Sequence, residues 1–167
     1  MKSLRQVSSC QNYKHKLLLK SMQFIALLLM GIELGVSYSH MMQLSGKSQL
    51  SVATFTTVQT VLIQYKLGVG IVEIGSFLAM TVILWLCQTK TLTFRLTLGA
   101  LLMLVVAFVV WGIFIEPINM AIDIWTASSF PNNWSSYRDR WHLFHLVRLA
   151  LLMVGTSSLI GSVLVKR

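Results

Sequence analysis

The stretch FRLTLGALLMLVVAFVVWGIFI, residues 94–115, decides the fold of this chain. After Arg95 it holds no charged residue, and the next charge along the chain is Glu116. Its length matches the ~20 apolar residues that a helix needs to cross the hydrocarbon core of a bilayer. The stretch therefore predicts a transmembrane helix, which Pro117 is expected to end or kink because proline lacks the backbone N–H.

Similar apolar blocks stand on both sides of this stretch. They predict further spans at about 21–42, 58–87 and 141–165. The block 58–87 is long for one crossing, so we expect it to tilt or to rise above the membrane. The fold we expect is all-α: an integral membrane four-helix bundle over residues 21–167. Residues 1–20 show no helical pattern and are predicted to form a basic, mobile cytoplasmic tail.

The composition of the whole chain agrees with a membrane location. Of its 167 residues 55% are hydrophobic and only 11% are charged, and the mean hydropathy is +0.71. A soluble domain carries about 25% charged residues, so this chain lacks the polar surface to face water on all sides. The formal net charge of +9 would indicate nucleic-acid binding in a soluble protein. Here the position of the charges gives another explanation.

Most basic residues fall on one side of the predicted spans. Nine of the 14 lie in the terminal segments or around the link between the second and third spans: Lys2, Arg5, Lys14, Lys16, Lys20, Lys90, Arg95, Lys166 and Arg167. None of the five acidic residues lies there. This positive-inside bias predicts cytoplasmic N- and C-termini, with segments 43–57 and 119–140 outside. We expect a bacterial inner membrane, the lipid bilayer as partner and no nucleic acid.

Two features would face lipid or the membrane boundary. Gly31 and Gly35 form a GxxxG step on the first span, which lets another helix approach closely and predicts a homo-oligomer contact. Aromatic residues around the last external segment are typical of an interfacial belt: Trp125, Trp134, Tyr137 and Trp141.

Polar residues recur at i, i+4 and i+7 on three predicted spans, which places each set on one helix face. The sets are Glu33, Ser37 and His40; Lys66, Gly70 and Glu73; and Trp141, His145 and Arg148. A charge at the centre of a span costs about 2.5–3.5 kcal/mol, so such residues usually face the bundle interior. The histidines would lie near the outer ends of their spans, and Glu33, Glu73 and Arg148 about two turns deeper. The pattern predicts a polar pocket open to the outer face.

Within this pocket, residue chemistry gives the expected roles. His145 and His40 are candidate catalytic proton acceptors, and Arg148 is a candidate anchor for an anionic group because its fork binds two oxygens. Glu73 and Glu33 are candidate ligand-binding residues. Two structural interpretations stay open: Glu73 paired with Lys66 or Arg148 to fix helix register, and histidines bonded to the loops.

A haem or metal site on the histidines is also conceivable, since bundle interiors host such ligands. His142 and His145 stand at i, i+3 but lack a Glu-x-x-His companion on another helix. We therefore predict no metal and no cofactor.

A longer motif carries a family resemblance. The residues from Glu116-Pro117-Ile118-Asn119 onward read P-x-N … W … W … RW-x3-H-x2-R, and earlier fragments are Ser39-His40, Gly46-Lys47, Val58-Gln59 and Glu73. Over residues 24–165 the chain resembles the anthrone-oxygenase-like family of small four-helix membrane proteins. The resemblance implies cofactor-free oxidation of an anthrone to an anthraquinone, and it implies site roles for Asn119, Trp141, His145 and Arg148. The chain differs from fungal members at His40, where an apolar residue or proline is expected.

Two functions from different classes follow from these observations. The first is an outer pocket for a small apolar, phenolic or quinone-like ligand, with an oxygenase-like activity that needs no cofactor. The second is a non-enzymatic membrane protein whose buried polar residues set helix packing or scaffold a partner.

Overall fold

The computed structural model of the chain describes residues 2–63, 66–87, 91–126 and 129–165, with side chains described from Tyr13 onward except at 62–66. Nearly all of this is helix. The elements are α1 (Lys2–Met42), α2 (Leu44–Lys47), α3 (Val52–Ile63), α4 (Lys66–Leu86), α5 (Leu92–Val110), the π-helix η1 (Trp111–Ile115), α6 (Glu116–Asp123) and α7 (Trp134–Leu164). Within the described ranges the only extended pairing is an isolated bridge between Thr126 and Ser129.

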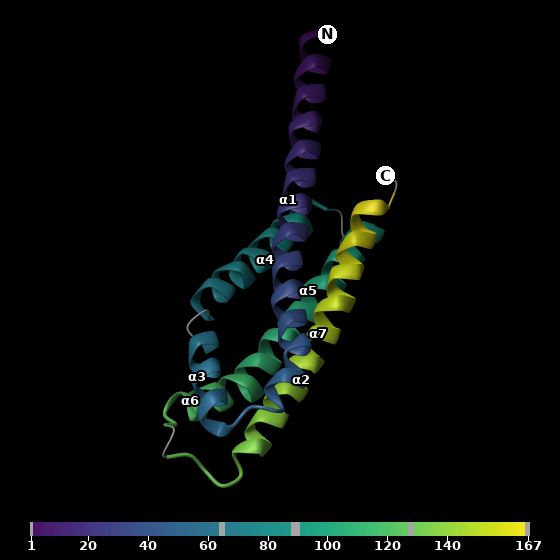
Figure 1. Cartoon of the computed structure of the whole chain (residues 1–167). Coiled ribbons are helices and arrows are strands. Elements are labelled where there is room, and N and C mark those ends of the chain that lie inside the picture. The colour runs from purple at the N-terminus through teal and green to yellow at the C-terminus, as the bar shows by residue number, and fades with distance from the viewer. Residues whose placement is uncertain (1, 64–65, 88–90, 127–128, 166–167) are drawn as a thin grey trace.

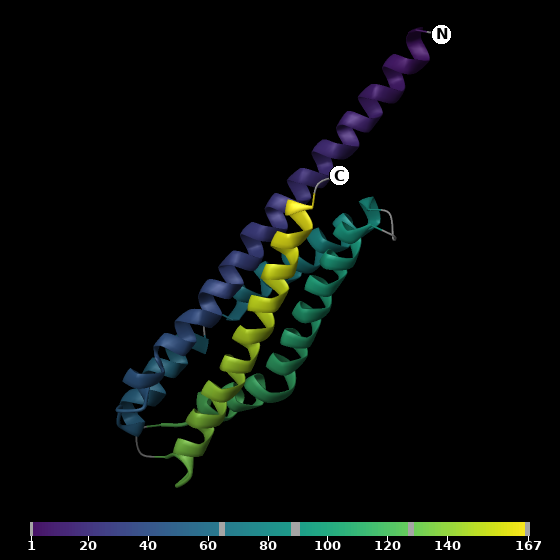
Figure 2. The same ribbon diagram turned by 90° about the vertical axis from the view of Figure 1, so that its right-hand side faces the viewer.

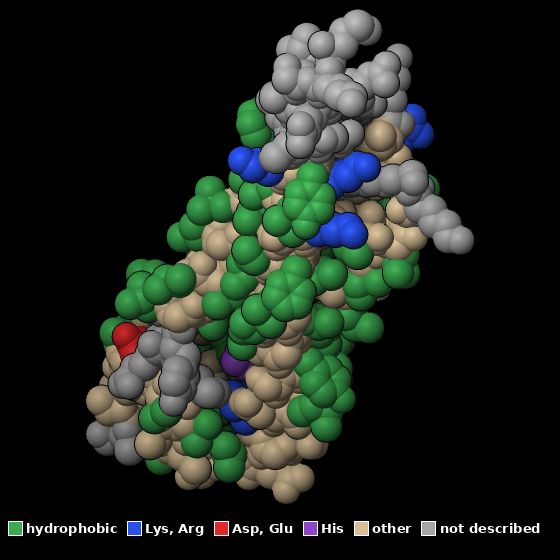
Figure 3. Space-filling model, turned by 90° about the horizontal axis from the view of Figure 1, so that it is seen from above, with side chains coloured by type: hydrophobic (Ala, Val, Ile, Leu, Met, Phe, Trp, Pro, Cys, Tyr) green, Lys and Arg blue, Asp and Glu red, His purple; other side chains and the backbone are tan. Residues whose placement is uncertain are grey.

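Four helical segments are long and apolar enough to cross a membrane: Tyr13–Lys47, Leu67–Leu86, Leu92–Asp123 and Trp134–Leu164. They form the all-α four-span arrangement that the sequence predicts. The start of α1 and the end of α7 lie at the same end of the molecule (Figures 1 and 2). Apolar side chains are spread along the whole face seen in Figure 3, and most of the visible Lys and Arg side chains gather near one end of it.

Helix α1 begins at Lys2 rather than near residue 21, so residues 2–20 are helical although their sequence shows no helical pattern. The cytoplasmic location of this segment stays a prediction. At ~1.5 Å per residue the 41 residues of α1 extend ~60 Å, about twice the hydrocarbon thickness. Its first turns project past the other helices (Figures 1 and 2). No glycine or proline precedes Gly31, so nothing in this segment breaks a helix that the downstream span has nucleated.

The predicted second span, 58–87, is divided in the structure. Its first residues belong to α3, which begins at Val52, and the membrane-crossing part is α4. The two helices run in different directions in Figure 1. The segment 43–57, which is predicted to lie outside, is therefore largely helical, with α2 and the start of α3, and α3 and α4 differ in direction.

The third helical segment is interrupted near Pro117 but does not end there, since it continues to Asp123. The α-helical pattern stops at Val110, widens into η1 and resumes as α6, with Pro117 in its first turn. A proline ring clashes with the carbonyl of the residue four positions earlier, and a π-turn is a common place for the resulting bend. The predicted loop 119–140 is shorter than expected, because α6 continues to Asp123 and α7 already begins at Trp134.

Two buried clusters divide the interior. The first, here called the apolar core, lies in the half of the bundle nearer to the two chain termini. It consists of Leu19, Ala26, Met30, Ala79, Met80, Ile83, Ala100, Leu104, Ala107, Leu152 and Leu159. The second, the aromatic cap, lies at the opposite end: Phe55, Ile115, Ile118, Ile122 and Trp141, with Trp125, Trp134 and Tyr137 packed against it. Trp141 is only 2% exposed, so it is an interior residue and not part of an interfacial belt.

Helices α5 and α7 approach each other closely at Gly155, which does not belong to the GxxxG pair. A Cβ on Gly155 of α7 would lie 3.2 Å from Met103 Cβ and 3.4 Å from the Ala100 carbonyl oxygen of α5. Gly31 and Gly35 are exposed, and no described atom lies within 4 Å of their Cβ positions. The GxxxG step is thus not used within the described part of this chain, and the homo-oligomer stays a prediction.

Candidate functional site

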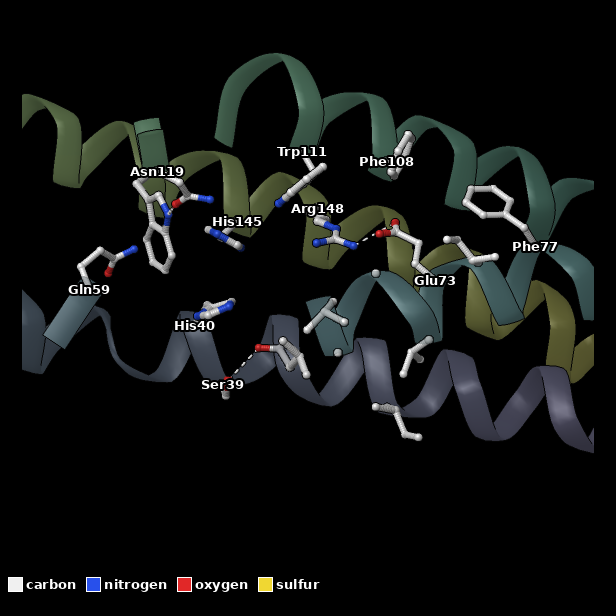
Figure 4. A pocket seen from close by; sticks show the side chains of 18 residues that line it. Ser39, His40, Gln59, Glu73, Phe77, Phe108, Trp111, Asn119, His145 and Arg148 are labelled. Carbon is white, nitrogen blue, oxygen red and sulfur yellow. Dashed lines mark hydrogen bonds and ion pairs between the residues drawn. The ribbon is translucent and has the colours of Figure 1, made fainter. Parts of the chain in front are cut away.

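A cavity of about 780 Å³ opens between the membrane helices on the side of the aromatic cap. Its polar lining comes from α1, α3, α4, α6 and α7: Ser39, His40, Gln59, Glu73, Asn119, Trp141, His145 and Arg148 (Figure 4). The rest of the lining is apolar or glycine, with Phe77, Phe108 and Trp111 among the larger side chains. Its volume falls within the ~300–1,000 Å³ of typical small-molecule pockets.

An ionic cluster lies at the deeper part of the site and joins three helices. The Arg148 Nη2 donates to Glu73 Oε1 at 2.9 Å and lies 3.7 Å from Glu33 Oε2. The Ser76 hydroxyl donates to Glu33 Oε1 at 3.1 Å. All four side chains are buried, Glu33 to 1% exposure. The guanidinium from α7 thus holds carboxyl groups from α1 and α4, which is the register-fixing pair expected for Glu73 and Arg148.

Two histidines face each other from α1 and α7. The ring centroids of His40 and His145 are 4.3 Å apart, and Figure 4 shows both rings pointing into the cavity region from opposite helices. The Nδ1 atom of each ring is buried and has no hydrogen-bond partner among the described residues. Buried polar atoms in folded proteins are nearly always bonded. Almost no surface of either Nδ1 atom is accessible, so neither nitrogen is open to the cavity as the rings stand, and neither is bonded to the loops among the described residues.

Trp141 forms a fixed wall beside the histidines. Its ring centroid lies 4.0 Å from that of His145 and 5.0 Å from that of His40. Its indole Nε1–H donates to Asn119 Oδ1 at 2.8 Å, and Asn119 Nδ2 donates in turn to Glu116 Oε2 at 3.1 Å. These bonds tie α7 to α6, directly after the bend at η1.

The sequence missed two residues that hold this wall in place. Lys47 Nζ donates to Gln59 Oε1 at 2.9 Å and lies 4.5 Å from the centre of the Trp141 ring, a cation–π distance. Lys47 and Gln59 are both buried, although Lys47 belongs to a segment predicted to stand outside the membrane. In the sequence, both residues stand only in fragments of the family motif, Gly46-Lys47 and Val58-Gln59.

Ser76 was also missed, and here a signal existed. It follows Glu73 by three residues, so it extends the same helix face towards the apolar core. His142 is a further buried residue, with its ring centroid 5.1 Å from that of Trp141.

The predicted site residues differ in where they lie relative to the cavity. The structure brings six together along the cavity: His40, Glu73, Asn119, Trp141, His145 and Arg148. Glu33 lies behind them and reaches the site through Arg148. The side chain of Lys66 lies outside the described residues. No group of three or more His, Cys, Asp or Glu side chains able to hold a metal ion occurs among the side chains that the structure describes.

No protein-family model, curated protein or solved structure matches this chain. The resemblance to the anthrone-oxygenase-like family therefore stays a prediction from the sequence motif.

Proposed function

We propose that the chain is a multi-pass membrane protein whose cavity binds a small, largely apolar molecule from the bilayer, such as a quinone or a polycyclic phenol. The observation that carries this proposal is the mostly apolar cavity of about 780 Å³ with the facing rings of His40 and His145 in its lining. These imidazoles would give the hydroxyl or carbonyl group of a ligand its polar partner in an otherwise apolar space.

The enzymatic form of the proposal assigns proton transfer to the histidine pair. His145 or His40 accepts the proton of a bound phenol, and the resulting anion forms a C–O bond with O2 at a ring carbon. The histidine returns the proton to give a hydroperoxide, which loses water as its O–O bond breaks and leaves a quinone carbonyl. Arg148 was expected to bind the oxyanion itself. Because its guanidinium already donates to Glu73, we assign it instead to positioning Glu73 on the cavity wall.

Co-purification tests the proposal. The protein is purified in mild detergent, its absorption spectrum and metal content are measured, and bound small molecules are identified by mass spectrometry. We expect a lipid-soluble phenol or quinone in the wild type and in the control His15→Ala, whose side chain is exposed and remote from the cavity. His145→Ala and His40→Ala should lose it. Folded protein without any bound molecule would contradict the proposal, and a Soret band would replace it with a haem site.

The competing proposal is a non-enzymatic protein whose polar interior only orders the helices. The contacts of Arg148 with Glu73 and Glu33 favour it, since they join three spans. The histidine variants separate the two proposals. If both fold as the wild type and support every function of the protein in a deletion strain, the polar interior is structural.

We further propose that both termini are cytoplasmic, in a bacterial inner membrane, so that the histidine pair lies towards the outer face. The distribution of Lys and Arg along the sequence supports this orientation. Reporter fusions after Lys90 and after Ser129 should report cytoplasmic and external positions respectively. The reverse result would place the cavity on the inner side.

A further inference from the structure

We infer that the cavity selects an uncharged ligand: a membrane-soluble molecule whose polar group is a hydroxyl or carbonyl, in preference to a carboxylate of the same size. This inference rests on the proposed function, since it names the class of molecule that the proposed site would bind. It follows from the charge balance of the site and from the way in which the cavity opens.

Among the side chains that the structure describes, the cation in the cavity lining is Arg148, and its charge is already compensated. Arg148 has a carboxylate oxygen of Glu73 at 2.9 Å and one of Glu33 at 3.7 Å. Two carboxyl groups therefore surround one guanidinium. Whether or not one of them carries a proton, no positive charge is left over for an incoming anion. A bound carboxylate would have to displace Glu73 or lie beside it, and like charges at such distances in a medium of low dielectric constant repel strongly.

A second buried cation stands near the cavity but does not line it. Lys47 directs its ammonium to Gln59 Oε1 and to the ring of Trp141, and these two residues form the wall. The ammonium group of Lys47 thus holds Gln59 and Trp141 in place and does not contact the ligand.

The histidine rings in the lining are suited to a neutral polar group. His40 and His145 both line the cavity, and their ring centroids are 4.3 Å apart. A neutral imidazole offers one N–H donor and one acceptor nitrogen. A hydroxyl or carbonyl group can bond to such a ring without bringing a charge into the site.

The opening of the cavity favours the same class of molecule. Several lining residues are exposed on membrane-spanning helices, including Ile32 of α1, Ile74 of α4 (61% exposed) and Phe108 of α5. The cavity therefore opens sideways between the spans, onto the region that lipid covers. A ligand arriving by this path leaves water before it meets a protein partner, and this desolvation is far more costly for an ion than for a hydroxyl or a carbonyl.

Binding of three matched probes tests the inference. The probes share a decyl chain and an aromatic ring and differ in the group para to the chain: para-decylphenol (neutral), para-decylbenzoate (anionic) and para-decylbenzylamine (cationic). Binding to the full-length protein in detergent at neutral pH is followed by quenching of tryptophan fluorescence, because Trp111 and Trp141 line the cavity. We expect the phenol to bind about tenfold or more tightly than either charged probe.

A charge-altered variant provides the gain-of-function arm. Glu33→Gln combined with Glu73→Gln leaves Arg148 without a carboxylate, so binding of the benzoate should improve by about tenfold or more and the phenol should lose its advantage. The triple variant that also carries Arg148→Gln has no charge in the cluster and should again prefer the phenol. This triple variant controls for a general change in the shape of the site.

The possible outcomes separate the two proposals. If the phenol binds the wild type but the benzoate or the amine binds equally well, the inference is wrong and the proposed function stands. If the benzoate gains nothing in a folded double variant, the charge balance does not set the selectivity, and the inference is again wrong. If no probe binds the folded wild type, the proposed function itself fails, and the inference fails with it.

Discussion

The two ends of this bundle are built from the same helices but are held together by different forces. On α1 the interior changes character between Met30 and Glu33, and on α7 between Arg148 and Leu152. On one side lies the apolar core, and on the other lie the ionic cluster, the histidine pair and Trp141. In both α1 and α7 the change takes only about one helical turn.

The apolar core has little hydrophobic driving force of its own, because lipid is as apolar as the side chains that it would replace. Close packing and a few hydrogen bonds must hold it. Gly155 lets α5 approach α7 closely, and the Ser158 hydroxyl donates to the Leu96 carbonyl oxygen at 2.8 Å. This end needs no specific charge.

The polar end has the opposite requirement. An ionised side chain in hydrocarbon needs a partner, and Arg148 with its two carboxyl groups meets that need. The neighbouring histidines leave nitrogens without partners. The apolar end also leaves buried oxygens without partners, at Thr97 and Thr156, so what distinguishes the polar end is its ionic cluster and the cavity beside it.

The largest expected effect is at the ionic cluster. Arg148→Leu leaves Glu33 and Glu73 buried without a cation, and we expect a loss of about 3–5 kcal/mol in the free energy of unfolding. Denaturant titration in mixed micelles measures it. A triple variant, Glu33→Gln, Glu73→Gln and Arg148→Leu, removes all the charges and should regain much of the loss. Equal stability of Arg148→Leu and wild type would show that the two ends do not differ in the way described.

A smaller effect is expected in the apolar core. Gly155→Val forces methyl groups against Met103 and the Ala100 carbonyl, and overpacking of this kind costs about 1–3 kcal/mol. Thermal unfolding in detergent gives the comparison. The matched control is Gly35→Val on α1, where no described neighbour lies within 4 Å of the Cβ position. If Gly35→Val proved the more damaging variant, the GxxxG face would be a real contact, and an oligomer through it should then be visible by crosslinking.

The smallest effect concerns the wall of the cavity. Trp141→Phe keeps an aromatic ring beside His145 but removes the indole N–H that Asn119 accepts, which we expect to cost about 1 kcal/mol. It should also remove tryptophan emission characteristic of a buried site. Trp85→Phe is the control, because Trp85 is 81% exposed on α4. Identical changes in stability for the two variants would argue against a fixed wall.

Much of the candidate site could be read from helical spacing. Glu33, Glu73 and Arg148 share a depth in the sequence pattern and meet in the structure, and His40 and His145 do the same. This succeeds because a charged residue in a span has few places to go other than the interior. Lys47 could not be placed in this way, since a lysine in a segment between spans is normally solvated.

The number of spans and the faces that turn inward could be predicted without the structure. Both follow from local properties: the length of the apolar blocks, the spacing of the polar residues and the proline after Ile115. A membrane-spanning backbone must satisfy its own hydrogen bonds, so each block has little choice but to form a helix.

Only the tertiary structure decided which residues pair and where the cavity lies. It divided 58–87 into α3 and α4, brought Lys47 and Gln59 against Trp141, and gave the guanidinium of Arg148 to Glu73 rather than leaving it for a ligand. These outcomes depend on the distances between helices that are far apart in the chain. Sequence periodicity fixes the direction in which a side chain points, but it does not fix which partner from another helix is there to meet it.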